Sequence, residues 1–169
     1  QNAKPCIILL MLGYARTMVL KGIDYHEHVT EYGIHWNFFI TLAITKIVGI
    51  SILYIFKEKT AWLSGIVLML IYEISLTCGL KDWVFGSVGR DTFLTANREG
   101  IVSCLGYVNL FLVSSYIGHI VHEKYEYKLE KDILNKLSLS VCISWAGTFV
   151  TNWIFDTSRS LANISYCCY

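Results

Sequence analysis

Two residues four positions apart, Glu31 and His35, offer the clearest chemistry in this sequence. If the chain is helical here, both side chains share one face, because residues i and i+4 are neighbours on a helix. The carboxylate could then hold the imidazole in the tautomer that a general base requires. Lys46, eleven residues after His35, would lie on the same stripe. In the alternative interpretation, Glu31 caps the helix and His35 is a hydrogen-bonded residue at the membrane interface.

A second polar group precedes a long apolar segment. Asn97 or Thr95 could cap the helix that Glu99 opens. With Arg90 and Arg98 beside it, a helix start with free N–H groups suits a phosphate head group. The alternative is an ordinary capped helix start with solvated arginines.

Long apolar runs must position these residues. The chain of 169 residues is 54% hydrophobic and 16% charged, whereas soluble domains are about a quarter charged. The charges fall in short clusters between apolar runs, and a membrane-spanning helix needs about 17–25 residues. We therefore predict an all-α, polytopic transmembrane helical bundle that forms part of one domain over residues 1–169. The expected spans are residues 6–20, 33–56, 61–80, 99–122 and 133–155, with the start of another at 160–169.

The apolar runs at the two ends are short. Residues 6–20 are short for a span, and the last run stops after about three helical turns. We therefore expect this sequence to be a stretch of a longer protein, truncated at both ends.

Charge and cysteine patterns argue against several classes of partner. The net charge is +1 without a basic stripe, so nucleic acid is not expected as a partner. The six cysteines show no CxxC spacing, so no zinc site or disulfide framework is expected. The sequence predicts no metal and no resident cofactor, and nothing in it specifies an oligomeric state.

Ionisable residues inside a membrane are costly and therefore indicate function. In this sequence they gather near one end of the expected spans. Counting lysines and arginines in the loops gives seven on one side and five on the other, which favours the second side as non-cytosolic. We expect a polar cavity to open on that side. The residues that converge there are Arg16, Glu31, His35, Glu73, Arg98, Glu99 and Arg159.

Three motifs resemble a known family in order and spacing. They are DYHEHVTEYGIHWNFFITL (Asp24–Leu42), LTANREGIVSCLGYV (Leu94–Val108) and SRSLAN (Ser158–Asn163). Together they resemble the glucosaminyl-phosphatidylinositol acyltransferases, which acylate inositol in the synthesis of glycosylphosphatidylinositol (GPI) anchors. The resemblance spans essentially the whole chain, which would be about a third of a family member.

The resemblance implies a multi-pass enzyme of the endoplasmic-reticulum membrane, with its polar motifs facing the lumen. Such an enzyme transfers a fatty acyl group, typically palmitoyl, from acyl-CoA to the inositol ring of glucosaminyl-phosphatidylinositol. Acyl-CoA is then a co-substrate, and membrane lipid surrounds the protein. We expect the 169 residues alone to be inactive, because polar motifs proposed for catalysis in the family would lie before Gln1.

The resemblance also implies roles for individual residues. Glu31 and His35 are the candidates for catalysis within this sequence. The candidates for substrate binding are Asn37, Lys46, Asn97, Arg98 and Glu99. All of them except Lys46 match the family motifs, and the alternative role for these four residues is architectural.

Two other functions fit parts of the pattern. A multi-span transporter of an anionic or lipid solute would also gather polar residues from several helices, but it predicts internal symmetry and polar groups near the midplane. A non-catalytic scaffold subunit predicts that replacing Glu31, His35 or Arg98 changes assembly rather than turnover.

Overall fold

The computed structural model describes residues 4–22, 29–57, 60–87, 89–126 and 130–169. Within these ranges the regular structure is entirely helical, which confirms the all-α prediction. Residues Asp24–His28 of the first motif lie outside the described residues.

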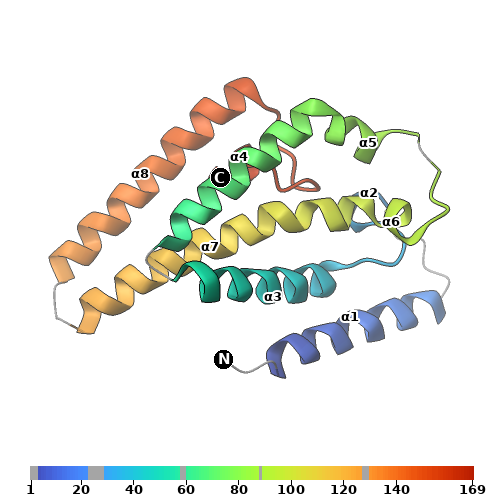
Figure 1. The fold of residues 1–169 in the computed structure, drawn as a ribbon, viewed down its shortest axis with the longest axis horizontal. Coiled ribbons are helices and arrows are strands. Elements are labelled where there is room, and N and C mark those ends of the chain that lie inside the picture. Colours follow the sequence, from blue (N-terminus) through green and yellow to red (C-terminus); the bar gives the residue numbers. More distant parts are fainter. Residues whose placement is uncertain (1–3, 23–28, 58–59, 88, 127–129) are drawn as a thin grey trace.

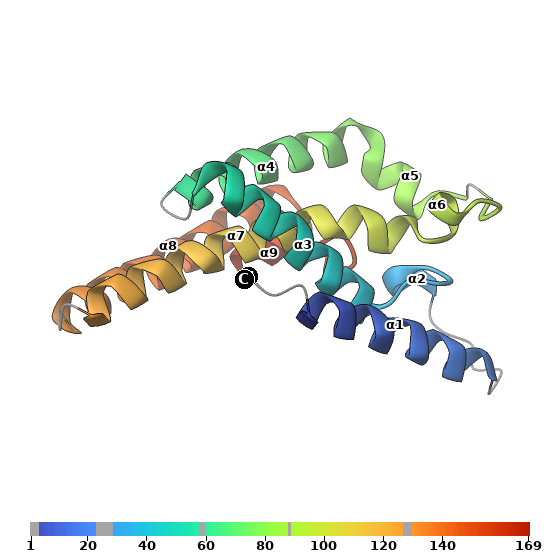
Figure 2. The ribbon, with the colours of Figure 1, turned by 60° about the horizontal axis from the view of Figure 1, so that its bottom comes forward.

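One long helix, α7, runs through the middle of the bundle (Figure 1). It packs against α3 and α4, while α1 packs on α3 at the periphery (Figure 2). The helix α8 is antiparallel to α7 and is largely exposed, as expected for a surface that faces lipid. The bounds are Lys4–Gly22 for α1, Phe38–Phe56 for α3, Ala61–Ser75 for α4, Arg98–Glu126 for α7 and Glu130–Ile154 for α8.

Four helical stretches of the described chain are long and apolar enough to cross a membrane. The protein is therefore a multi-pass membrane protein. The helix α1 is not among these four, so the first of the expected spans stays a prediction. The four stretches are Phe38–Phe56, Ala61–Phe85, Arg98–His122 and Lys131–Ile154.

The second expected span begins at Phe38, five residues later than residue 33. Gly33 has a φ of 107°. This backbone conformation, which residues other than glycine rarely adopt, is not helical and ends the short helix α2 (Val29–Tyr32). Asn37, whose backbone is extended, then caps α3. Its side-chain oxygen accepts hydrogen bonds from the N–H groups of Phe39 and Ile40. The expected continuous helix through Glu31 and His35 is wrong for this reason.

The third span continues past residue 80 through a π-helical turn. This turn, η2 (Leu76–Leu80), contains Gly79 with a φ of 112° and leads into α5 (Lys81–Phe85). The extra residue of a π turn bends a helix, and such turns are frequent at functional sites. The bend directs α5 toward the start of α7 (Figure 1).

After α8 the chain turns back into the bundle as a loop of residues 155–163, which we call the return loop. It lies against α4 and α7 and leads into the short helix α9 (Ile164–Cys168). The hydroxyl of Tyr72 donates to the carbonyl of Leu161 at 2.6 Å. The carboxylate of Glu73 accepts from the N–H of Ile164 at 3.0 Å. Two adjacent side chains of α4 therefore fix the end of the loop.

The side chain of Asn163 organises the loop from inside. Its oxygen accepts from the N–H groups of Ser158 and Tyr166 at 3.0 and 3.3 Å, and its nitrogen donates to the Asp156 carbonyl at 2.8 Å. Asn163 is 4% exposed. The amide therefore replaces the backbone pairing that a helix would supply.

The return loop approaches α7 closely at Gly106. A Cβ atom at this position would lie 1.9 Å from the carbonyl oxygen of Ala162, which itself has a φ of 47°. Gly106 lies eight residues into α7, about 12 Å along its axis. Non-helical backbone at such a depth is tolerated only where it is buried in protein or lines a water-filled cavity.

We expect Gly106→Ala to displace the return loop and to destabilise the full-length protein by about 1–3 kcal/mol, the usual cost of overpacking. The thermal midpoint of the detergent-solubilised protein measures this change. Gly118→Ala is the matched control, because Gly118 lies in the same helix with open space at its Cβ position. Equal midpoints for the two variants would contradict the close contact.

Candidate functional site

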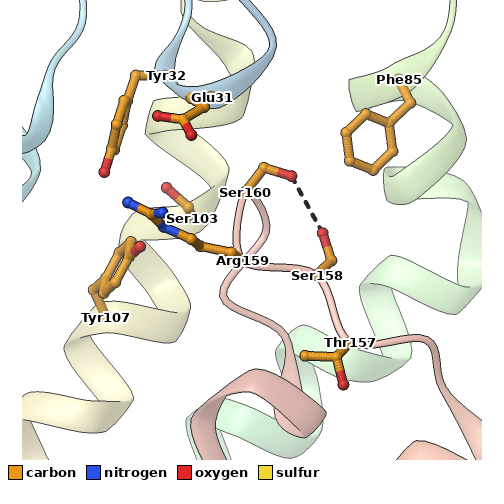
Figure 3. A pocket seen from close by; sticks show the side chains of 9 residues that line it. All are labelled: Glu31, Tyr32, Phe85, Ser103, Tyr107, Thr157, Ser158, Arg159 and Ser160. Carbon is orange, nitrogen blue, oxygen red and sulfur yellow. Dashed lines mark hydrogen bonds between the residues drawn. The ribbon is translucent and has the colours of Figure 1, made fainter.

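A pocket of about 420 Å³ lies where α2, α5, α7 and the return loop meet (Figure 3). Its polar side contains the charged residues Glu31 and Arg159, whereas Phe85 faces them across the pocket. The remaining lining residues are Tyr32, Ser103, Tyr107, Thr157, Ser158 and Ser160.

The pocket reaches from the end of the bundle into the membrane-spanning part. Ser103 and Tyr107 lie five and nine residues into α7, which corresponds to about 8 and 14 Å along the helix. Phe85 is the last residue of its span. The pocket therefore lies at the end of one membrane-spanning stretch and beside the first turns of another.

Arg159 supplies a permanent positive charge to this pocket. Its guanidinium extends from the return loop toward Tyr32, Ser103 and Tyr107 (Figure 3). A hydrogen bond with the Tyr32 side chain, together with the negative charge of Glu31, raises the pKa of Arg159 above its usual range. Arg159 is exposed, so its remaining N–H groups can reach an anion in the pocket.

Hydroxyl groups lie on both sides of the return loop: those of α2 and α7 lie around the guanidinium, whereas those of the loop itself point toward Phe85 (Figure 3). The hydroxyls of Ser158 and Ser160 lie 3.2 Å apart on the return loop (Figure 3). Phe85 is 49% exposed on the opposite side and offers apolar surface. A guanidinium beside hydroxyl donors binds phosphate well, and the apolar surface suits the lipid that carries such a phosphate.

The structure separates the two candidates for catalysis. Glu31 is exposed and lines the pocket. His35 is exposed in the bend between α2 and α3 and is not among the lining residues. Because Gly33 interrupts the helix, no common helical face joins these two residues. The catalytic roles of both residues stay predictions.

Lys46 also departs from the expected stripe. It lies in α3 and is half-buried. His35 lies outside that helix, so the stripe expected to join the two side chains does not exist. A role for Lys46 in substrate binding stays a prediction.

Asn37 is buried and joins two helices. Its side-chain oxygen accepts from the N–H groups of Phe39 and Ile40, at 3.0 and 3.2 Å. Its nitrogen donates to the Gly13 carbonyl at 2.9 Å and to the Thr17 hydroxyl at 3.1 Å. Because these partners belong to α1 and to α3, Asn37 holds α1 against the start of α3.

Asn97 fixes the bend that follows α2. Its side-chain oxygen accepts from the N–H of His35 at 2.8 Å, and its nitrogen donates to the Phe93 carbonyl at 2.8 Å. A Cβ atom at Gly33 would lie 2.5 Å from the Cα of Asn97. The first and second motifs therefore meet directly, backbone against backbone.

Of the two residues expected to cap α7, Asn97 directly precedes the helix, and its carbonyl accepts from the N–H of Ile101 at 3.0 Å. The Asn97 side chain bonds His35 and Phe93, as described above. Thr95 instead forms a capping box with Thr92 at the start of α6 (Phe93–Ala96). Both side chains therefore bond groups outside α7.

The arginines beside the start of α7 are occupied by protein groups. Arg90 donates to both carboxylate oxygens of Glu99, one of them at 3.2 Å. Arg98 donates to the Gly86 carbonyl at 2.7 Å, and its guanidinium lies 6.0 Å from the centre of the Trp83 ring. Arg98 and Glu99 are 3% and 2% exposed. This cluster fixes α5 against α7, and a phosphate site at this helix start stays a prediction.

Sequence reasoning missed most of the pocket. It included Glu31, and it counted Arg159 among the converging charges without assigning it to the site. Ser103 and Tyr107 look like ordinary residues of an apolar helix, and no periodicity distinguishes them. The available signal was the SRSLAN motif, whose polar residues interrupt two apolar runs.

Comparison with known proteins gives one consistent family. All of residues 1–169 match the family model described as GWT1. The chain is 34% identical over 192 residues to GPI-anchored wall transfer protein 1 of Cryptococcus neoformans var. grubii. This alignment covers 98% of this chain and 31% of that protein. It is 32% identical over 169 residues to the human glucosaminyl-phosphatidylinositol-acyltransferase PIGW, with 94% and 33% covered.

A relative from another organism gives the same result. The phosphatidylinositol-glycan biosynthesis class W protein of Dictyostelium discoideum is 34% identical over 166 residues, with 94% of this chain and 32% of that protein covered. The chain spans about a third of the length of these curated relatives.

We expect Glu99→Ala to destabilise the full-length protein by roughly 3–5 kcal/mol, because it leaves the buried charge of Arg98 without its neighbouring carboxylate. The thermal midpoint and the yield of folded protein measure this effect. Asp91→Ala, at an exposed carboxylate of the same region, is the control. An unchanged midpoint with lost activity would instead assign Glu99 to the substrate site.

Proposed function

The chain belongs to the GWT1 family, and on this basis we propose that the protein transfers a fatty acyl group to the inositol ring of glucosaminyl-phosphatidylinositol. The names of the human and bovine relatives describe this activity. The proposed donor is acyl-CoA, typically palmitoyl-CoA. The proposed location is the endoplasmic-reticulum membrane, with the pocket on the lumenal side.

One observation carries the proposal for the site: a permanently charged guanidinium, Arg159, lines a pocket at the end of a membrane-spanning stretch. Phosphatidylinositol carries a phosphodiester between its inositol and its glycerol. The planar guanidinium can donate two parallel hydrogen bonds to such a phosphate. Ser158 and Ser160 add hydroxyl donors on the same loop.

The apolar side of the pocket then receives the lipid. Phe85 lies opposite the charged residues and ends a membrane-spanning stretch. A glycolipid bound with its phosphate at Arg159 would direct its acyl chains toward the surrounding hydrocarbon. This orientation keeps the inositol ring at the membrane surface, where a second substrate can reach it.

Acyl transfer makes further demands on the full protein. An inositol hydroxyl attacks the thioester carbonyl, its proton passes to a base, and the thiol of CoA leaves. The reaction also needs donors that stabilise the oxyanion. Glu31 and His35 stay the candidates for the base, which leaves His35 alone if Glu31 binds a substrate group instead. Lys46 stays a candidate for an anionic substrate group. We assign Asn37, Asn97, Arg98 and Glu99 to shaping the site, since protein groups occupy their polar atoms.

A transporter is less well supported. The polar residues of the pocket gather at the end of the bundle where α7 begins. This placement favours a site for a lipid head group over a path across the membrane.

Microsomes from a host without its own inositol acyltransferase test the proposal. They carry the full-length protein and receive labelled palmitoyl-CoA and glucosaminyl-phosphatidylinositol. We expect transfer by the wild type and a rise in KM of about tenfold or more for Arg159→Ala, from the loss of a charge-assisted hydrogen bond. Arg159→Lys should recover part of the affinity, because it keeps the charge without the planar fork.

Lys136→Ala is the matched control, because Lys136 is an exposed cation on α8. It should leave KM unchanged. Absence of transfer by the wild type would refute the proposed activity. Transfer with equal KM for Arg159→Ala and the wild type would remove the phosphate from this pocket.

A further inference from the structure

The pocket holds two opposite charges that face the same space. Glu31 and Arg159 both line it, and both are exposed. Figure 3 draws the carboxylate and the guanidinium on the same side of the cavity, with Phe85 across from them. A phosphate alone would gain from the arginine and be repelled by the glutamate, because like charges at short range are unfavourable.

The backbone beside Glu31 is fixed. The bend after α2 is tied to the start of α7 by the N–H of Ile34, which donates to the Ala96 carbonyl at 3.0 Å, and by the bond from His35 to Asn97. Gly33 allows this close approach because a side chain there would overlap the backbone of Asn97. The short segment that carries Glu31 is therefore held beside the pocket by packed backbone.

Among the residues that the structure describes, Glu31 and Arg159 do not form a direct ion pair. The Tyr32 side chain hydrogen-bonds Arg159, and this neutral partner leaves the net charge of the guanidinium in place. Glu31 attracts Arg159, but both side chains stay open to the cavity. A ligand with an anionic and a cationic group close together would satisfy both residues without introducing a net charge.

Glucosaminyl-phosphatidylinositol has this charge pattern. In any glucosaminide the amine is on the carbon next to the glycosidic carbon, so the ammonium lies close to the inositol ring and its phosphate. Ordinary phosphatidylinositol has the phosphate without the ammonium. An N-acetylated sugar has an amide there, which carries no positive charge and adds bulk.

We propose that Glu31 determines substrate specificity by binding the free ammonium of the glucosamine while Arg159 binds the phosphate. This inference rests on the proposed function. The carboxylate forms a charge-assisted hydrogen bond with the ammonium. The carboxylate disfavours the N-acetylated lipid for two reasons: the positive charge is missing, and the amide oxygen would face the carboxylate. No bond is made or broken in this step.

The test compares three acceptors for the full-length enzyme in the same microsomes. They are glucosaminyl-phosphatidylinositol, its N-acetylated form, and the glucosyl analogue in which a hydroxyl replaces the amine. The readout is the ratio of kcat/KM between the amine and the hydroxyl acceptor. We expect the wild type to prefer the amine by about tenfold or more.

Glu31→Gln should reduce this preference to nearly one, mainly through KM for the amine acceptor, and Glu31→Asp should retain most of it. Arg159→Ala is the comparison, because losing a phosphate contact should weaken all three acceptors equally. A preference that stays the same in Glu31→Gln would overturn the inference while leaving the proposed function intact. A wild type without transfer to any acceptor would refute both.

Phosphatidylethanolamine carries the same pair of charges and provides a second control. If Glu31 and Arg159 read a sugar ammonium, adding this lipid to the vesicles of a reconstituted enzyme should leave KM for the amine acceptor unchanged. A KM that rises in proportion to the added lipid would make the pocket a general site for zwitterionic lipids and would overturn the role in specificity.

Discussion

Backbone that leaves a helix inside a membrane must find hydrogen-bond partners within the protein, and the return loop depends on this requirement. Tyr72 and Glu73 supply two partners from α4, and the Asn163 side chain supplies three from within the loop. Gly106 provides the space that lets the loop reach α7. The position of Arg159 follows from these contacts, because the same loop carries it into the pocket.

A second joint, formed where α2, α3 and α5 meet the start of α7, positions the negative charge of Glu31. Gly33 and Asn97 bring the bend after α2 against the start of α7, while Asn37 closes the start of α3 and ties it to α1. Arg98 and Glu99 fix α5 against the same end of α7. Buried polar groups are used here for positioning. Asn37 and Asn97 accept from backbone N–H groups that the interrupted helices leave without a helical partner.

The two joints have a common functional consequence. They bring residues from four separate segments to one pocket at the end of a membrane-spanning stretch, with two exposed charges on one side and apolar surface on the other. The proposed substrate has a phosphate, an ammonium and a lipid in close succession. An acyltransferase that acts on a minor lipid must select it from many similar ones, and paired charges provide selection without a net gain of charge in the membrane.

The sequence alone determined the all-helical, multi-pass architecture, because apolar length and the position of charges are enough to specify spanning helices. It also indicated that charges gather at one end of the bundle, and its motifs indicated the family. Tertiary structure decided which of these polar residues face a cavity. Asn37, Asn97, Arg98 and Glu99 are buried in joints, whereas Arg159 lines the pocket. Helical spacing could not separate these cases, since Gly33 breaks the helix on which the spacing was counted, and the partners that bury or expose each side chain come from segments far apart in the chain.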